Sequence, residues 1–215
     1  MKSILIIGLG RFGRHMARKF TEQGHSVLAI ERNSETADSC IEIVKDIQIG
    51  DARSELFIDS LGVSNFDLCV VAIGDDFLTS LEITVLLKDY GARYIVARAT
   101  RDVYRNLLLR NGADYVVYAE REIAERLAIR FGSRNIYDYV RLGPDFEIFE
   151  ISAPSAWIGH SILDKQVRRR HNVTILAVKD SRTGQISASP APDYVFNRDD
   201  WLIVLGTASD VEKLR

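Results

Sequence analysis

Cysteine, proline and tryptophan are scarce in this 215-residue chain, which contains two, four and two of them respectively. Cys40 and Cys69 lack the spacings of metal-binding or redox motifs, which excludes a disulfide scaffold and indicates a reducing compartment. We expect Cys69, inside an apolar run, to be a small core residue. The formal net charge is only −2, so no nucleic-acid partner is expected.

Long apolar runs are also missing. No stretch approaches the ~20 apolar residues of a membrane-spanning helix, and the first apolar run is broken by glycines instead of showing a signal-peptide pattern. We therefore expect a cytoplasmic protein, and if it acts at a membrane we expect it to act through a partner. The phosphate loop of P-loop NTPases, the zinc-protease motif and the nucleophile elbow are absent as well.

The first half of the chain alternates between apolar, Val- and Ile-rich runs and helical stretches, a pattern typical of a parallel, doubly wound α/β sheet. The expected strands are 3–8, 26–31, 46–49, 67–73, 94–97 and 115–118. The expected helices are 11–23, 34–41, 54–61, 77–90 and 102–111, with Gly24, Gly62, Gly91 and Gly112 ending four of them. A Rossmann-like nucleotide-binding domain is thus predicted at 1–118.

The pattern changes after residue 118. Residues 119–131 are expected to form a helix with Ile123, Leu127 and Phe131 on one stripe. This helix either packs on its own sheet or, as the segment 119–134 that connects two different architectures, is a crossover or dimerisation helix. From 135 to 215 we expect a small α+β ligand-binding domain. Its strands are expected at 147–152, 173–179 and 201–206 and its helices at 161–170 and 210–215.

The most informative stretch is the apolar run at 4–7 that ends in G-x-G-x-x-G. Gly8 allows the tight turn out of the strand, Gly10 allows backbone to approach a pyrophosphate, and Gly13 allows the helix to pack close to the sheet. The helix N-terminus that follows offers free N–H groups and a positive dipole end to phosphate oxygens. A nucleotide site is therefore predicted here.

Two charged residues refine this site. Glu31 ends the second expected strand, ~20 residues after the glycines, where dinucleotide-binding proteins place an acid that binds the ribose. Its negative charge disfavours a ligand with a 2′-phosphate, although the neighbouring Arg32 weakens that exclusion. The alternative is a solvated loop acid. Arg11 lies in the loop beside Phe12 and can pair bidentately with a terminal phosphate. Its alternative is a solvent-facing arginine at a helix start, which the dipole disfavours.

Other candidates follow strands whose carboxyl ends meet at one edge of the sheet, where open α/β sheets bind ligands. Asp51 could accept from an adenine amino group or cap the next helix. Glu120 could bind the ligand, or it could only stabilise the N-terminus of the next helix through the helix dipole. The remaining residues expected at this edge are Ala52, Ala72, Ile73, Gly74 and Arg98.

These motifs, taken in order, resemble the RCK (regulator of potassium conductance) family, and more narrowly the KtrA/TrkA-type subunits of bacterial potassium uptake systems. The resemblance covers nearly the whole chain. The matching segments are IGLGRFG at 7–13, GHSVLAIE at 24–31, VAIG at 71–74, NGAD at 111–114, TILAV at 174–178, SPAP at 189–192 and DWLIVLG at 200–206.

The resemblance implies a cytosolic regulatory subunit that binds ATP, ADP or NAD(H) and is not an enzyme. Its homodimers would build an octameric ring on a potassium-translocating membrane subunit of the KtrB/TrkH type, and nucleotide exchange would gate transport. Arg11 would reach the terminal phosphates, within one subunit or across the dimer interface. Glu31 would hold the ribose, Asp51 the adenine, and Glu120 a divalent cation near the phosphates.

Some relatives bind cyclic di-AMP in a groove of the C-terminal lobe. The resemblance places Ile162, Arg168, Thr174 and Pro190 on that surface. Thr174 stands where some relatives carry Asn, and Arg169, Arg170 and His171 make the region more basic than usual. A second ligand is thus an expectation separate from the first.

Three other functions share parts of this pattern. An NAD-dependent oxidoreductase would need a proton donor after a sheet strand, whereas His15, His25, His160 and His171 all lie elsewhere. A redox-sensing transcription factor would need a DNA-binding module, and the cluster at 168–170 is too short for one. A free-standing nucleotide sensor without a channel partner shares every motif above.

Overall fold

The computed structural model describes residues 1–133, 135–143 and 145–214. The chain divides into two compact units, Met1–Glu120 and Arg121–Arg215. Arg134 and Arg215, which end the expected segments 119–134 and 210–215, lie outside the described residues. Each unit is described by itself below.

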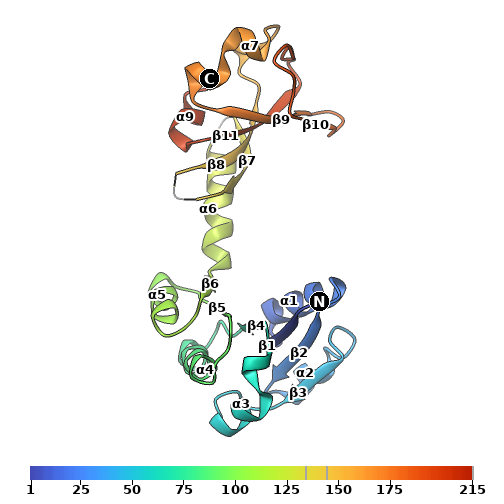
Figure 1. The fold of residues 1–215 in the computed structure, drawn as a ribbon, viewed down its shortest axis with the longest axis vertical. Helices are drawn as coiled ribbons and strands as arrows, with labels where there is room; N and C mark the ends of the chain where they lie inside the picture. The colour runs from blue at the N-terminus through green and yellow to red at the C-terminus, as the bar shows by residue number, and fades with distance from the viewer. Residues whose placement is uncertain (134, 144, 215) are drawn as a thin grey trace. The chain divides into compact units, whose positions relative to one another are not determined.

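The first unit is built on a six-stranded parallel sheet in the order β3-β2-β1-β4-β5-β6 (Figure 1). Its apolar strands lack polar alternation because helices cover both faces of the sheet, as predicted for a doubly wound fold. The strand order reverses between β1 and β4, which creates the crevice where such sheets bind ligands. The strands are β1 (Ser3–Ile7), β2 (Ser26–Glu31), β3 (Asp46–Ile49), β4 (Leu68–Val71), β5 (Ile95–Arg98) and β6 (Tyr115–Val117).

Two apolar layers hold the helices on the sheet. On one face, residues of α1 and of the segment after α2, at 40–44, pack with Ile4, Ile6 and Val70. On the other, residues of α3, α4 and α5 pack with Leu5 and Cys69. The helices are α1 (Arg11–Glu22), α2 (Ser34–Asp38), α3 (Glu55–Leu61), α4 (Phe77–Asp89) and α5 (Asp102–Arg110), with a short 3-10 turn at Val63–Asn65.

Local sequence explains where these helices begin and end. Side chains cap three N-termini: Asn33 accepts from the Thr36 N–H, Ser54 from Phe57 and Asp76 from Thr79. The four glycines expected at C-termini all have positive φ, a conformation that disfavours any side chain: Gly24, Gly62, Gly91 and Gly112.

The second unit contains a five-stranded antiparallel sheet in the order β10-β9-β11-β8-β7. One of its faces packs on short helices around Phe149, Trp157, Phe196 and Leu202. Its strands are β7 (Ile136–Arg141), β8 (Glu147–Ser152), β9 (Thr174–Asp180), β10 (Ile186–Ala188) and β11 (Asp200–Gly206). Its helices are α7 (Ile162–Lys165), α8 (Val167–His171) and α9 (Ala208–Glu212), with a 3-10 turn at Ser155–Trp157.

The structure corrects the expectations for this unit in three places. The single helix expected at 161–170 is wrong, because Gln166 adopts the left-handed conformation (φ 48°) and separates α7 from α8. The final helix begins earlier than residue 210, since Thr207 caps it. Strands β7 and β10 were not expected at all.

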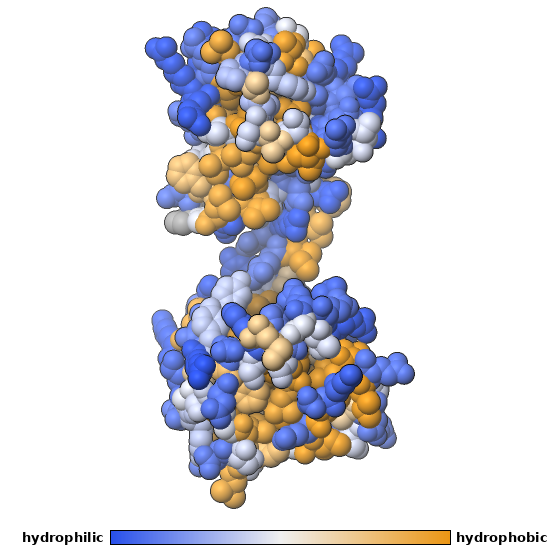
Figure 2. Space-filling model, turned by 45° about the vertical axis from the view of Figure 1, so that its right-hand side comes forward, coloured by the Kyte–Doolittle hydropathy of each residue, from blue (hydrophilic) through white to orange (hydrophobic). Residues whose placement is uncertain are grey.

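Helix α6 (Ala119–Gly132) follows β6 and contains no buried residue (Figure 1). Its apolar stripe is therefore open in a single chain: Ile123, Leu127 and Phe131 are 57%, 43% and 77% exposed. Hydrophobic atoms are visible on this segment and on the surface of both units in Figure 2. Among the described residues, none of the helices combines the length and the apolar character needed to span a bilayer.

Candidate functional site

A cavity of about 270 Å³ lies at the carboxyl edge of the parallel sheet, where strands β1 to β5 end. It brings together most of the residues that the sequence places at this edge: Gly8, Gly10, Arg11, Glu31, Arg32, Asp51, Ala52, Ala72, Ile73, Gly74 and Arg98. Three other expected residues, Phe12, Gly13 and Glu120, are not among the residues that line the cavity, although each contacts or supports ones that are.

The three loop glycines are required for different reasons. Gly8 has φ +95°, so a side chain there would be strained. A Cβ on Gly13 would overlap the Gly8 carbonyl oxygen, which shows that α1 packs directly against the end of β1. A Cβ on Gly10 would meet nothing within 4 Å, and its backbone is extended (φ −63°, ψ −176°). Nothing described in the protein itself requires glycine at position 10, which is what a site for an approaching ligand predicts.

Glu31 is held by the backbone around it. Its Oε2 accepts from the Leu9 N–H at 2.7 Å, and its Oε1 accepts from the N–H groups of Arg32 and Asn33 at 2.8 and 3.0 Å. These bonds tie the glycine loop to the end of β2. An ionised carboxylate has about four lone-pair sites, so Glu31 retains capacity for one more donor, such as a ribose hydroxyl.

The N-terminus of α1 opens into the cavity without a cap of its own. Gly10 supplies no side-chain cap, and the first turn contains no acidic residue to offset the helix dipole. Arg11 is exposed at this end of the helix and lines the cavity. Free N–H groups, a positive dipole end and a guanidinium together make this end of the cavity suitable for phosphate.

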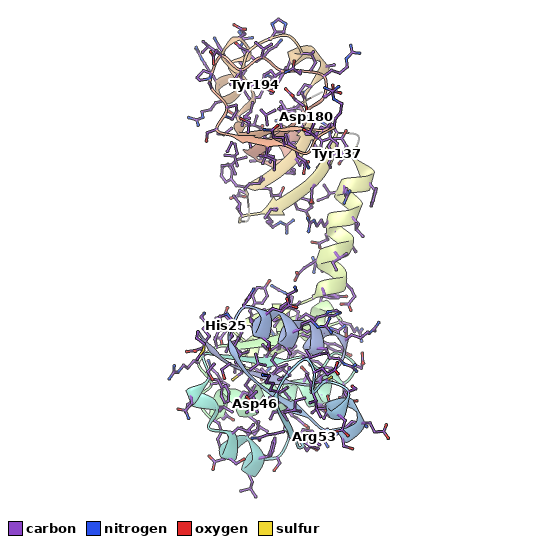
Figure 3. All side chains as sticks on the ribbon, turned by 90° about the vertical axis from the view of Figure 1, so that its right-hand side faces the viewer. His25, Asp46, Arg53, Tyr137, Asp180 and Tyr194 are labelled. Atoms are coloured by element: carbon purple, nitrogen blue, oxygen red, sulfur yellow. The ribbon has the colours of Figure 1, made fainter. Side chains whose placement is uncertain are left out.

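Asp51 follows β3 and pairs with Arg53 rather than capping a helix. The Arg53 Nη2 donates to Asp51 Oδ2 at 2.6 Å and Nε to Oδ1 at 3.0 Å. Hydrogen bonds from the Arg53 side chain, and then from its backbone N–H, lower the pKa of Asp51 to about 2. Figure 3 labels Arg53 just beyond one end of β3, with Asp46 at the other. The alternative of Asp51 as N-cap is wrong, because Ser54 caps α3.

Arg98, the last residue of β5, lines the cavity. Its guanidinium lies over Gly74, where an added Cβ would come within 2.6 Å of Nη1, and its Cζ is 5.8 Å from the Phe12 ring centroid. Its Nη2 donates to Glu120 Oε1 at 2.8 Å. The pKa of Glu120 is lowered first by a hydrogen bond from the Glu120 backbone N–H, then by the hydrogen bond from Arg98, and then by the charges of Arg98 and Arg11.

Sequence reasoning missed some of the residues that complete this cavity. Asp76 and Thr79 line it, and the Asp76 carboxylate accepts from the Thr79 hydroxyl at 2.7 Å. The Asp-x-x-Thr spacing before a helix could have identified them as a cap at the cavity rim. Arg53, which pairs with Asp51 but is not among the residues that line the cavity, had no comparable signal.

The second group of expected residues also meets in one place. Ile162, Arg168, Thr174 and Pro190 line a groove of about 520 Å³ between α7, α8 and β9, together with Arg169 and several apolar side chains. Its two arginines suit an anionic ligand.

Neither a metal cluster nor a larger hollow in the second unit offers a stronger site among the described residues. In the described parts of the chain, no three His, Cys, Asp or Glu side chains come together as metal ligands, so a cation at Glu120 would need phosphate oxygens as further ligands. A hollow of about 790 Å³ in the second unit is lined mainly by small and apolar residues, and Glu212 is the one charged side chain among its described lining residues.

The chain matches the TrkA-N domain over residues 4–119 and the TrkA-C domain over residues 146–215. It is similar to Ktr system potassium uptake protein C of Bacillus subtilis (strain 168), with 33% identity over 212 residues that cover 99% of this chain and 95% of the relative. It is also similar to Ktr system potassium uptake protein A of the same organism, with 31% identity over 212 residues and the same two coverages.

Solved structures of GsuK share the fold. The GsuK channel bound to NAD matches 97% of this chain and 38% of that chain, with a TM-score of 0.71 and 20% identity. GsuK bound to ADP matches 60% of this chain and 34% of that chain, with a TM-score of 0.54 and 21% identity. The chain thus spans less than half the length of these channels.

Proposed function

The chain belongs to the family of potassium uptake proteins built from a TrkA-N and a TrkA-C domain, and from that premise we propose that it is a regulatory subunit controlled by an adenine nucleotide. The nucleotide binds in the cavity at the carboxyl edge of the parallel sheet. Gly10 carries this proposal: the space that its Cβ would occupy is open, and it lies in the wall of the cavity at the N-terminus of α1, so an approaching ligand is the best explanation for glycine there.

The proposed contacts follow from the chemistry around the cavity. The pyrophosphate lies on Gly10 and the N-terminus of α1, with Arg11 at the terminal phosphate. Glu31 accepts from the ribose and Asp51 from the adenine amino group. Phe12, Gly13, Arg32, Ala52, Ala72, Ile73, Gly74 and Arg98 complete the walls or support them.

The ligand is ATP or ADP, or alternatively NAD(H). The fold neighbour GsuK has been solved with NAD and with ADP, which supports the class of ligand. Arg11 favours a ligand with a terminal phosphate, because a plain pyrophosphate is already suited to the helix end. A divalent cation bridging Glu120 and the phosphates fits this arrangement, with phosphate oxygens as its other ligands.

The partner we propose is a potassium-translocating membrane subunit of the KtrB/TrkH type, with the chain at the cytoplasmic face of the membrane. Homodimers assembled into an octameric ring would transmit the nucleotide's effect. A ligand changes such an assembly only through its different affinity for two states. The groove lined by Ile162, Arg168, Thr174 and Pro190 is the proposed place for cyclic di-AMP.

An oxidoreductase is the competing function, because it would use the same glycine loop. No histidine lines the described cavity, so it offers no imidazole as a proton donor beside a nicotinamide. A free-standing nucleotide sensor is the second alternative, and co-purification with a membrane subunit distinguishes it from a channel regulator.

A melting-temperature screen against ATP, ADP, NAD⁺, NADH and cyclic di-AMP tests the proposal, because a ligand that binds only the folded state stabilises it. We expect at least one adenine nucleotide to raise Tm, and Gly10→Ala to abolish that shift while leaving the unliganded Tm within a few degrees. Gly143→Ala is the matched control, since a Cβ there also meets nothing within 4 Å. An equal shift in Gly10→Ala would contradict the assigned site.

A further inference from the structure

Arg98 connects the nucleotide cavity to the first turn of α6. The cavity wall includes its guanidinium, and the same group donates to Glu120, the second residue of α6. Arg98 is 17% exposed, whereas Glu120 is 59% exposed. One side chain therefore contacts both the cavity and the helix at which the second unit begins.

We propose that Arg98 is a relay residue: it exchanges the Glu120 carboxylate for a phosphate oxygen of the bound nucleotide, and so releases the first turn of α6. This inference rests on the proposed nucleotide site and adds to it the path by which occupancy reaches the second unit.

The hydrogen bonding of Arg98 supports such an exchange. Its Nε is buried and finds no hydrogen-bond partner among the residues that the structure describes, which is costly for a guanidinium with five donors. A phosphate can accept from Nε and an Nη together, which a carboxylate bound at Nη2 alone does not do. Gly74 leaves room for the guanidinium, because an added Cβ would come within 2.6 Å of Nη1, and the Arg98 Cζ lies 5.8 Å from the Phe12 ring centroid.

Glu120 is suited to be the group displaced. Its Oε1 accepts from the Arg98 Nη2 at 2.8 Å, and Arg98 lines the cavity, so a phosphate at this guanidinium competes with Glu120 for the same donor. The Glu120 side chain is 59% exposed, so water can solvate its carboxylate once Arg98 releases it.

A double-mutant cycle tests the exchange by calorimetry with ATP and with ADP, in the presence of a chelator so that no cation bridges Glu120 to the phosphates. Arg98→Gln is expected to weaken ATP about tenfold, the magnitude of one charge-assisted hydrogen bond. Glu120→Gln is expected to tighten ATP about fivefold by removing the competitor. In the Arg98→Gln background, Glu120→Gln should then change the affinity less than about twofold.

The control is Glu125→Gln, which removes the same charge from α6 at a residue paired with Arg121. It should leave ATP affinity unchanged. If Glu120→Gln tightens ATP equally with and without Arg98, the effect is general charge repulsion and the relay is wrong. If Arg98→Gln does not fold, Arg98→Lys keeps the charge but loses the fork, and should still lose most of the coupling.

Hydrogen exchange provides a readout that a merely structural Arg98 would not change. ATP should speed amide exchange at 120–123 in the wild-type chain and have no such effect in Arg98→Gln or Arg98→Lys. Unchanged exchange in the wild-type chain with ATP bound would overturn the relay. If no nucleotide binds the wild-type chain at all, the proposed function fails instead, and the two failures are distinguishable.

Discussion

At the scale of residues, the glycines of the loop have different roles, which an added Cβ atom reveals. Gly13 is required by the protein, because a Cβ would overlap the Gly8 carbonyl oxygen, whereas Gly10 faces open space. The sequence motif treats these glycines alike, and only the packing separates a structural glycine from a ligand-facing one. The Asp51–Arg53 pair is a similar case. The sequence identified Asp51 as a site residue, but no motif or spacing predicted that Arg53 would pair with it.

Arg11 is predicted to discriminate ATP from ADP. Arg11→Ala should weaken ATP about tenfold, the magnitude of a charge-assisted phosphate contact, and leave ADP almost unchanged. Calorimetry gives the ratio of the two affinities directly. Arg18→Ala is the matched control, because Arg18 is also exposed on α1 but does not line the cavity. An ATP/ADP ratio equal to that of the wild-type chain would place the discrimination elsewhere.

At the scale of elements, the first unit was predictable because its signals are local and repeat. Apolar strands, N-caps and glycine C-termini agree with one another, and the six strands and five helices expected in that region are all present. The second unit was harder. Gln166 adopts the left-handed conformation although it is not a glycine, so the sequence did not predict the break between α7 and α8. Strand β10 is a three-residue edge strand that is defined by its pairing with β9 rather than by its composition.

Strand β4 is predicted to make stability pH-dependent through Cys69. Burial raises the pKa of this thiol from 9.0 to about 12, so the folded state keeps its proton where the unfolded state loses it. The stabilising contribution is complete below about pH 9 and is lost as the pH rises from 9 toward 12, by up to about 1.4 kcal/mol per pH unit.

Urea unfolding at pH 8, 9 and 10 measures this dependence. Cys69→Ala should be less stable at pH 8 because of the cavity it leaves, and its stability should fall less steeply with pH than that of the wild-type chain. Equal slopes in the two proteins would show that another group is responsible.

At the scale of the whole molecule, the proposed self-association rests on the open apolar stripe of α6. The sequence predicted the stripe and left two alternatives for it, packing on its own sheet or forming a dimer. In the structure, Ile123, Leu127 and Phe131 are exposed in a single chain, and exposed apolar stripes of this kind are typical of protein interfaces. The exposure of these three side chains therefore gives no support to packing of the stripe on the chain's own sheet.

Leu127→Asp is predicted to shift the chain toward a monomer in sedimentation experiments, because a charge in an apolar interface is left without a partner. Ala128→Asp is the control: it adds the same charge to an exposed position outside the stripe, and should leave the oligomer intact. Dissociation by both variants, or by neither, would argue against an interface on this stripe.

Calorimetric titration of the wild-type chain with adenine nucleotides tests the central claim most directly. We predict saturable binding of one ATP, ADP, NAD⁺ or NADH per chain, which Gly10→Ala removes while the protein remains folded. An absence of binding by all four compounds to the folded wild-type chain would contradict the account.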